Sequence, residues 1–169
     1  MNSERVAAAS IIFEGKMWVT GGSDKALRPI ASTELIDPHE LNMVSSLANI
    51  SNSYSAKKPQ IFYIDLPEAI SYHSIIRLNY TTSFLIAGQT ETSDQTDKTY
   101  YFHHTTNTWT NGPHLTTRRR FHTAGVIKDR VTFTEHVVVA GGVDSHEEMI
   151  DSVEIMFNNE NKWTPGKVI

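Results

Sequence analysis

The sequence predicts an all-β protein, and three observations support that prediction. Thr, Ser, Val, Ile and aromatic residues dominate, and no long segment keeps the i, i+3, i+4, i+7 apolar spacing of an amphipathic helix. Turn residues recur between short extended runs. One pattern, an apolar run ending in a small residue and a glycine before a polar turn, occurs three times, as KMWVTGGSD (16–24), SFLIAGQTE (83–91) and HVVVAGGVDS (136–145).

This pattern divides the 169 residues into three units within one domain, 1–169. The second glycines, Gly22, Gly88 and Gly142, are spaced by 66 and 54 residues. In each unit one extended run precedes the glycine pattern, whose apolar part forms a second strand, and a third strand follows the polar turn. In two units a segment with a tryptophan comes next. The units are predicted at about 5–67, 70–116 and 119–166, and the first carries an inserted Ser/Asn-rich loop at 39–59.

The three units resemble kelch repeats, in which a diglycine ends one strand, an aromatic residue follows near the end of the next, and a tryptophan comes six or seven residues later. The positions that carry the resemblance are Gly21, Gly22, Gly88, Gly141, Gly142, Phe102, Trp109, Phe157 and Trp163. The first unit has no tryptophan after its diglycine, and Phe62 is the nearest substitute. The resemblance implies a partial kelch-type β-propeller of about three four-stranded antiparallel blades, with glycines at crowded inner strands and tryptophans between blades.

In such a propeller we expect each unit to supply the outer strand of one blade and then three strands of the next. The run at 5–13 then has no blade of its own, and the blade of Trp163 lacks its fourth strand. Three blades cannot close around an axis, so two sheet edges and one apolar face remain open. The chain is therefore expected to be a fragment, a shortened relative, or a protomer that self-associates through these edges.

Composition excludes several kinds of site and partner. A formal net charge of -4 argues against nucleic acid or an anionic membrane as the partner. The absence of cysteine excludes disulfides, thiol nucleophiles and cysteine-based metal sites. No apolar run approaches the roughly 20 residues of a membrane span, and the N-terminus has no basic region of a signal peptide, so a cytoplasmic location is expected.

No residue pattern indicates catalysis, so we expect neither a catalytic residue nor a cofactor. Neighbouring strand residues His103 and His104 point to opposite faces, so we also expect no metal site, and His73 and His122 match repeat positions that suggest a structural role. A Ser-His-Asp triad is compatible with the sequence, but no G-x-S-x-G motif supports one.

The arginines at the start of the first and third units are the candidate binding residues, and the second unit has no equivalent. The kelch resemblance implies that Arg119 and Arg5, with Arg118 and Arg120 beside them, line the rim of the propeller and bind an acidic protein segment. The loops after the diglycines lie on the same rim, where Asp24 and Asp144 are expected to cap turns. The favoured function is a protein-interaction scaffold, similar to substrate receptors of ubiquitin ligases. The alternative is a sugar-active or other small-molecule enzyme with paired carboxylates near the axis.

Overall fold

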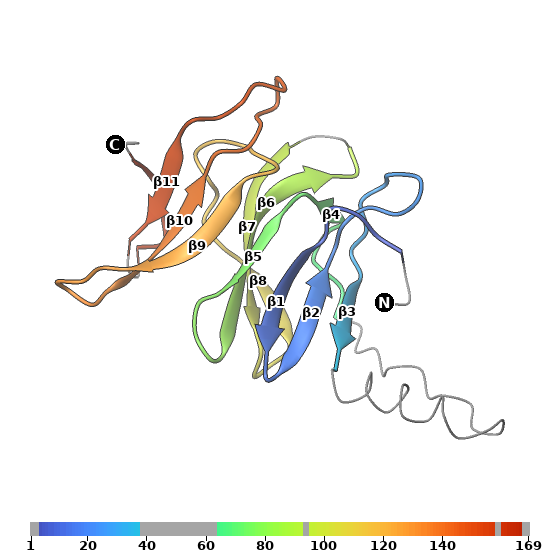
Figure 1. Ribbon diagram of the computed structural model, residues 1–169, viewed down its shortest axis with the longest axis horizontal. Coiled ribbons are helices and arrows are strands. Elements are labelled where there is room, and N and C mark those ends of the chain that lie inside the picture. The colour runs from blue at the N-terminus through green and yellow to red at the C-terminus, as the bar shows by residue number, and fades with distance from the viewer. Residues whose placement is uncertain (1–3, 38–63, 93–94, 158–159, 167–169) are drawn as a thin grey trace, which may run out of the picture.

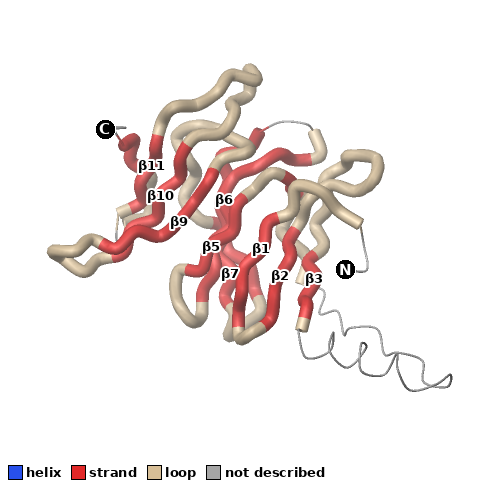
Figure 2. The backbone as a smooth tube through the Cα atoms, in the orientation of Figure 1, coloured by secondary structure: helices blue, strands red, loops and turns tan. Residues whose placement is uncertain are grey.

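The computed structural model describes residues 4–37, 64–92, 95–157 and 160–166. In these ranges the secondary structure consists of β-strands without a helix, so the all-β prediction is confirmed (Figure 2). The strands form three antiparallel sheets that lie side by side in chain order, the first at the right of Figure 1 and the third at the left. The inserted loop at 39–59 and Phe62 lie outside the described residues.

Each sheet is a meander of strands in chain order. The first contains β1 (Ala9–Phe13), β2 (Lys16–Thr20) and β3 (Thr33–Ile36). The second contains β4 (Ile70–Ser71) and β5 (Ser74–Arg77), which both pair with β6 (Thr82–Thr90), followed by β7 (Gln95–His103) and β8 (Thr108–Asn111). The third contains β9 (Thr123–Lys128), β10 (Glu135–Ala140), β11 (Val153–Met156) and β12 (Thr164–Gly166).

This topology corrects the strand assignment expected from the sequence. The run at 5–13 is no outer strand of a different sheet, because β1 pairs with β2 from Ala9↔Thr20 to Phe13↔Lys16. The two residues between them, Glu14 and Gly15, both have positive φ (49° and 74°), as a tight type I′ hairpin requires. The third sheet likewise does not lack a fourth strand, since β12 pairs with β11 at its edge.

Counting from the diglycine gives a common register for the three units. Val19, Leu85 and Val139 are equivalent, and they lie directly opposite Glu34, Tyr100 and Glu154 on the next strand. The same count places Met156, and not Phe157, at the position of Phe102. Met156 is buried and Phe157 is 40% exposed, so the predicted assignment of Phe157 was wrong by one residue, and that step moves a strand side chain to the other face.

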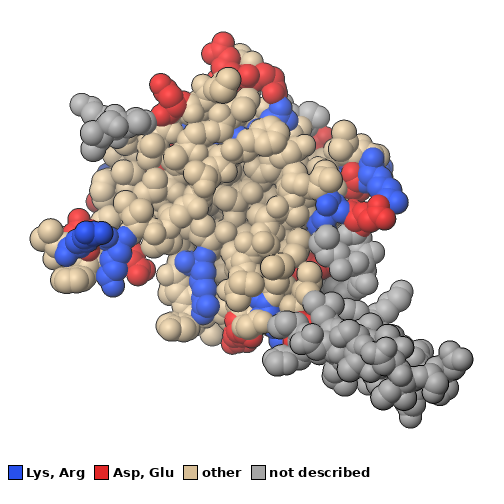
Figure 3. Space-filling view, in the orientation of Figure 1, with Lys and Arg blue, Asp and Glu red and all other residues tan. Residues whose placement is uncertain are grey.

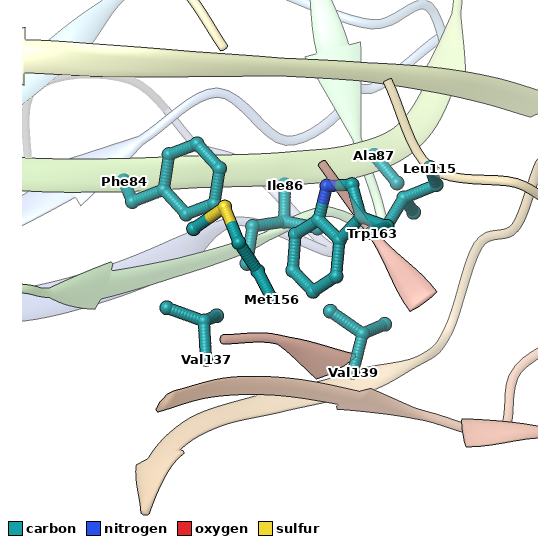
Figure 4. Close-up of a cluster of buried hydrophobic side chains, with 8 residues drawn as sticks. All are labelled: Phe84, Ile86, Ala87, Leu115, Val137, Val139, Met156 and Trp163. Carbon is teal, nitrogen blue, oxygen red and sulfur yellow. The ribbon is translucent and has the colours of Figure 1, made fainter. Parts of the chain in front are cut away.

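The core lies between neighbouring sheets. Phe84 and Ile86 from β6 contact the near face of the third sheet, where Trp163 is 6% exposed and its Nε1 donates to the carbonyl of Pro113 at 2.9 Å (Figure 4). The remaining members of this cluster are Ala87, Leu115, Val137, Val139 and Met156. A second cluster fills the space between the first and second sheets, where Trp109 packs at its margin beside Leu66, Ile70, Ile75, Leu85 and Tyr100.

The diglycine positions are constrained by close approach as well as by φ. At Gly22 (φ 93°) an added Cβ would lie 2.6 Å from the carbonyl oxygen of Val6, and at Gly88 (φ 125°) it would lie 2.5 Å from that of Ser71. Gly142 (φ 103°) has the same relation to the carbonyl of Arg120, at 2.5 Å. A side chain at any of these three positions would push apart two paired strands of its own unit, so glycine is required.

Candidate functional site

Arg5, which the sequence placed on the binding rim, lies inside the first unit. Its side chain is 1% exposed and its Nη2 lies 2.6 Å from Oε1 of Glu34. The Nη1 atom donates to the carbonyl oxygens of Gly21 at 3.0 Å and Ser32 at 2.8 Å. The guanidinium therefore ties the diglycine turn to β3.

Arg119 repeats this arrangement in the third unit. Its side chain is 0% exposed, its Nη2 lies 2.8 Å from Oε1 of Glu154, and its Nη1 donates to the carbonyls of Gly141 and Ser152 at 3.0 and 3.3 Å. The Glu154 carboxylate also accepts the backbone N–H groups of Thr116 and Thr117, so both of its oxygens accept hydrogen bonds.

These contacts correct the expected role of two of the four arginines. A guanidinium that is fully buried and bonded to a carboxylate and two carbonyls cannot reach an acidic ligand at the surface. Arg5 and Arg119 are structural residues that fix the diglycine turns. The sequence carried a signal for this role, because a lone glutamate stands inside an apolar strand in both TELI (33–36) and VEIM (153–156).

The second unit lacks the arginine and uses a different set of groups. Ile70 stands at the arginine position and Tyr100 at the glutamate position. The Tyr100 hydroxyl donates to Oε1 of Glu68 at 2.6 Å, and Lys98 Nζ lies 2.9 Å from the other oxygen of the same carboxylate. Burial, reinforced by the hydrogen bond to Glu68, raises the pKa of Tyr100, so the hydroxyl stays a donor.

Arg120 lies at the rim and bridges the second and third units. Its Nη1 donates to Oε1 of Gln89, and its Nη2 lies 2.7 Å from Oε1 of Glu147. The guanidinium also lies 5.1 Å from the ring of Phe121, which is 55% exposed and contacts the ring of Tyr72. Arg120 is therefore paired across the two units, and its guanidinium lies near the exposed ring of Phe121 and the half-buried ring of Tyr72.

Arg118 is the one predicted binding arginine whose side chain is exposed and for which the described residues offer no hydrogen-bond or ionic partner. It lines a surface hollow of about 390 Å³ beside the turn between β6 and β7. Two cations, Arg118 and Lys98, and three carboxylates, Glu68, Glu91 and Asp97, border this hollow together with Thr90, Thr92, Gln95 and Thr96. Its polar lining can donate and accept hydrogen bonds from several directions.

Two matching loops extend the same edge of the molecule. The carboxylate of Asp24 accepts the backbone N–H groups of Ala26 and Arg28 at 2.8 and 2.9 Å, and Asp144 accepts those of His146 and Glu148 at 2.8 and 3.0 Å. Hydrogen bonds from the backbone lower the pKa of both carboxyl groups. Both aspartates therefore cap turns, as the sequence predicted.

The two repeat-matched histidines lie between the sheets. His73 Nε2 lies 2.9 Å from Oγ1 of Thr20 in the first unit, and His122 Nε2 lies 2.8 Å from Oγ of Ser74 in the second. Burial lowers the pKa of His73 to about 3, with a smaller contribution from His122. Burial, followed by the charge of Arg119, lowers the pKa of His122 to about 4. Both rings are therefore neutral at physiological pH and join adjacent units.

His103 and His104 point to different surroundings, as adjacent strand residues do. His104 stacks on Phe13 with ring centroids 3.6 Å apart and bonds Oγ of Ser83, whereas His103 bonds Oγ1 of Thr110. Within the described ranges no three His, Cys, Asp or Glu side chains come together in a way that could hold a metal ion.

Compared with protein-family models and with curated protein sequences, the chain gives no match. In the part of the chain that the structure describes, there is also no helix with the length and apolar character needed to cross a membrane.

Proposed function

We propose that this chain is a protein-interaction module whose three sheets are consecutive blades of a kelch-like partial propeller. The repeated turn supports this proposal, because Arg5 and Arg119, which are more than 100 residues apart, make the same three kinds of contact. Buried ion pairs of this kind hold the turns rigidly, and rigid scaffolds that present surface loops are typical of binding proteins.

The hollow beside Arg118 is the proposed partner site, and the exposed guanidinium of Arg118 is the observation that carries it. Arginine forms bidentate bonds with carboxylates, and here it stands in a polar hollow between loops of the rim. Because Glu68, Glu91 and Asp97 border the same hollow, the site favours a protein segment with both acidic and basic groups over a purely acidic one. On the face in Figure 3, charged side chains gather toward the loop ends, while the middle carries few.

Peptides selected by display against the full chain test this proposal. We expect selected peptides to compete for one site, and Arg118→Glu to weaken their binding at least tenfold in fluorescence polarisation. Arg130→Glu is the matched control, because Arg130 is also an exposed arginine but lies in the β9–β10 hairpin at the opposite end of the third sheet. Equal loss in both variants, or retention in Arg118→Glu, would contradict the proposed site.

A further inference from the structure

In both contacts between neighbouring sheets, the same face of one sheet packs on the opposite face of the next. We call the face of a sheet that meets the next sheet along the chain its leading face, and the opposite face its trailing face. In the second sheet the leading face carries Phe84 and Ile86, both 0% exposed, and these pack on the trailing face of the third sheet, which carries Val137 and Val139. Ala9 and Ile11 on the leading face of the first sheet meet the second sheet in the same way.

The leading face of the third sheet is apolar and only partly covered. Val138 and Ala140 stand at the positions of Phe84 and Ile86, yet both remain partly exposed, and Ile127 is 51% exposed. The apolar residues of this face are Gly125, Ile127, Val138, Ala140, Val153 and Ile155, and the same face also carries Thr123, His136 and Thr164. A contiguous apolar surface of this kind marks an interaction site.

The trailing face of the first sheet is the matching surface at the other end of the array. Ile12, Met17 and Ile36 stand at the positions of Val126, Val137 and Met156, which are the residues of the third sheet that face the second. Ile12 is 57% and Met17 40% exposed, whereas Val137 and Met156 are 5% and 8% exposed. Val19 and Glu34 on the same face are buried, so this surface is open at Ile12 and Met17.

Backbone groups at the two ends are complementary as well. The N–H of Tyr72 donates to the carbonyl of Ala7 at 3.0 Å, and the N–H of Phe121 donates to the carbonyl of Tyr72 at 3.3 Å. These three residues share a positive φ of 54–58° at equivalent places in the units. Among the described residues, no group bonds the carbonyl of Phe121 or the N–H of Ala7, the acceptor and donor that a further step of this ladder would use.

Gly141 lacks, within one copy, the neighbouring sheet that its equivalent in the first unit contacts. A Cβ at the equivalent Gly21 would lie 2.8 Å from Cε1 of His73 in the next sheet, whereas a Cβ at Gly141 would meet only the carbonyl of Ile150, at 3.7 Å. Ala87 occupies this position in the second unit with φ 47°, so the backbone conformation by itself admits a methyl group. The close approach that explains glycine at position 21 is missing at position 141 within one copy.

We propose that the leading face of the third sheet packs on the trailing face of the first sheet in a second copy of this chain. This contact repeats the packing already present twice inside each copy, and it adds the hydrogen bond between Phe121 and Ala7. It is heterologous, so two copies that use it twice close a ring of six sheets. The proposal does not depend on the partner site at Arg118.

Two exposed substitutions test the contact in the full chain. Ile127→Lys places a charge on the leading face of the third sheet, and Ile12→Lys places one on the trailing face of the first. Because each position is more than half exposed, neither change should alter the thermal unfolding of the monomer. Burying the unpaired ammonium should weaken self-association about 100-fold or more, measured by sedimentation equilibrium.

Mixing the two variants distinguishes this contact from a symmetric one. Each variant alone should be monomeric, whereas the mixture should form a 1:1 complex through the one intact pair of faces. A wild-type chain that stays monomeric at millimolar concentration, or an Ile12→Lys variant that associates as the wild type does, would overturn the proposal.

Discussion

Replacing Arg119 by methionine leaves the buried carboxylate of Glu154 without its cationic partner. Glu154 is 1% exposed, and after the change its carboxylate would keep only the N–H groups of Thr116 and Thr117. Breaking a buried pair by removing one partner costs about 3–5 kcal/mol, because an uncompensated charge remains. We expect Arg119→Met to lower the free energy of unfolding by about that amount in urea denaturation followed by circular dichroism.

A double mutant and a substitution at the neighbouring arginine test whether the loss comes from the unpaired charge. Glu154→Gln in the Arg119→Met background removes the buried charge but keeps an acceptor for Thr116, and should restore about 2 kcal/mol. Arg118→Met, one residue away and exposed, should change stability by less than about 0.5 kcal/mol. If Arg119→Met lowers the free energy of unfolding by less than about 1 kcal/mol, the buried ion pair is not structural. Arg119 would then again be a candidate binding residue.

Three further predictions concern the packing between sheets. His73 and His122 have folded-state pKa values below the unfolded value of about 6.5, so the chain keeps its full stability above pH 6.5 and loses it as the pH falls toward 4. Each histidine should contribute a loss of about 1.4 kcal/mol per pH unit in that window, and a flat profile of urea midpoints between pH 7 and 5 would be inconsistent with their burial. Trp163→Ala should lower the free energy of unfolding by about 3–5 kcal/mol, and a loss below about 1 kcal/mol would mean that it is no core residue. Gly21→Ala should shift the thermal midpoint down by several degrees because its methyl group meets the carbonyl oxygen of Ile70 and the ring of His73, whereas an unchanged midpoint would refute the close approach at Gly21.

The sequence predicted the strands themselves better than the pairing between them. Apolar runs and glycine turns locate the strands, but the run at 5–13 has no property that distinguishes an edge strand of its own sheet from an outer strand of another. The Glu14-Gly15 pair was the available signal, because a two-residue loop ending in glycine favours a tight hairpin with the next strand. Phe157 shows a similar limit, since a one-residue error in counting changes the face of the sheet.

The arginine cluster shows why the site was only partly predictable. Arg118, Arg119 and Arg120 are consecutive, yet one is exposed, one is fully buried and one is paired at the rim. The sequence identifies three cations, but it does not show which of them pairs with a carboxylate 35 residues later in the chain. Only the fold, which places Glu154 opposite Val139, shows that Arg119 is structural and that Arg118 is exposed.

Photo-crosslinking from the rim tests the proposed function most directly. A photoreactive residue at Thr92, which is exposed beside Arg118 in the hollow, should crosslink to one segment of a selected peptide or partner protein. The same residue at Val131, which is 85% exposed in the β9–β10 hairpin at the opposite end, should give no crosslink. Crosslinks that form from Val131 and not from Thr92 would contradict the account, because the partner would then bind the end of the sheets that lacks the diglycine turns.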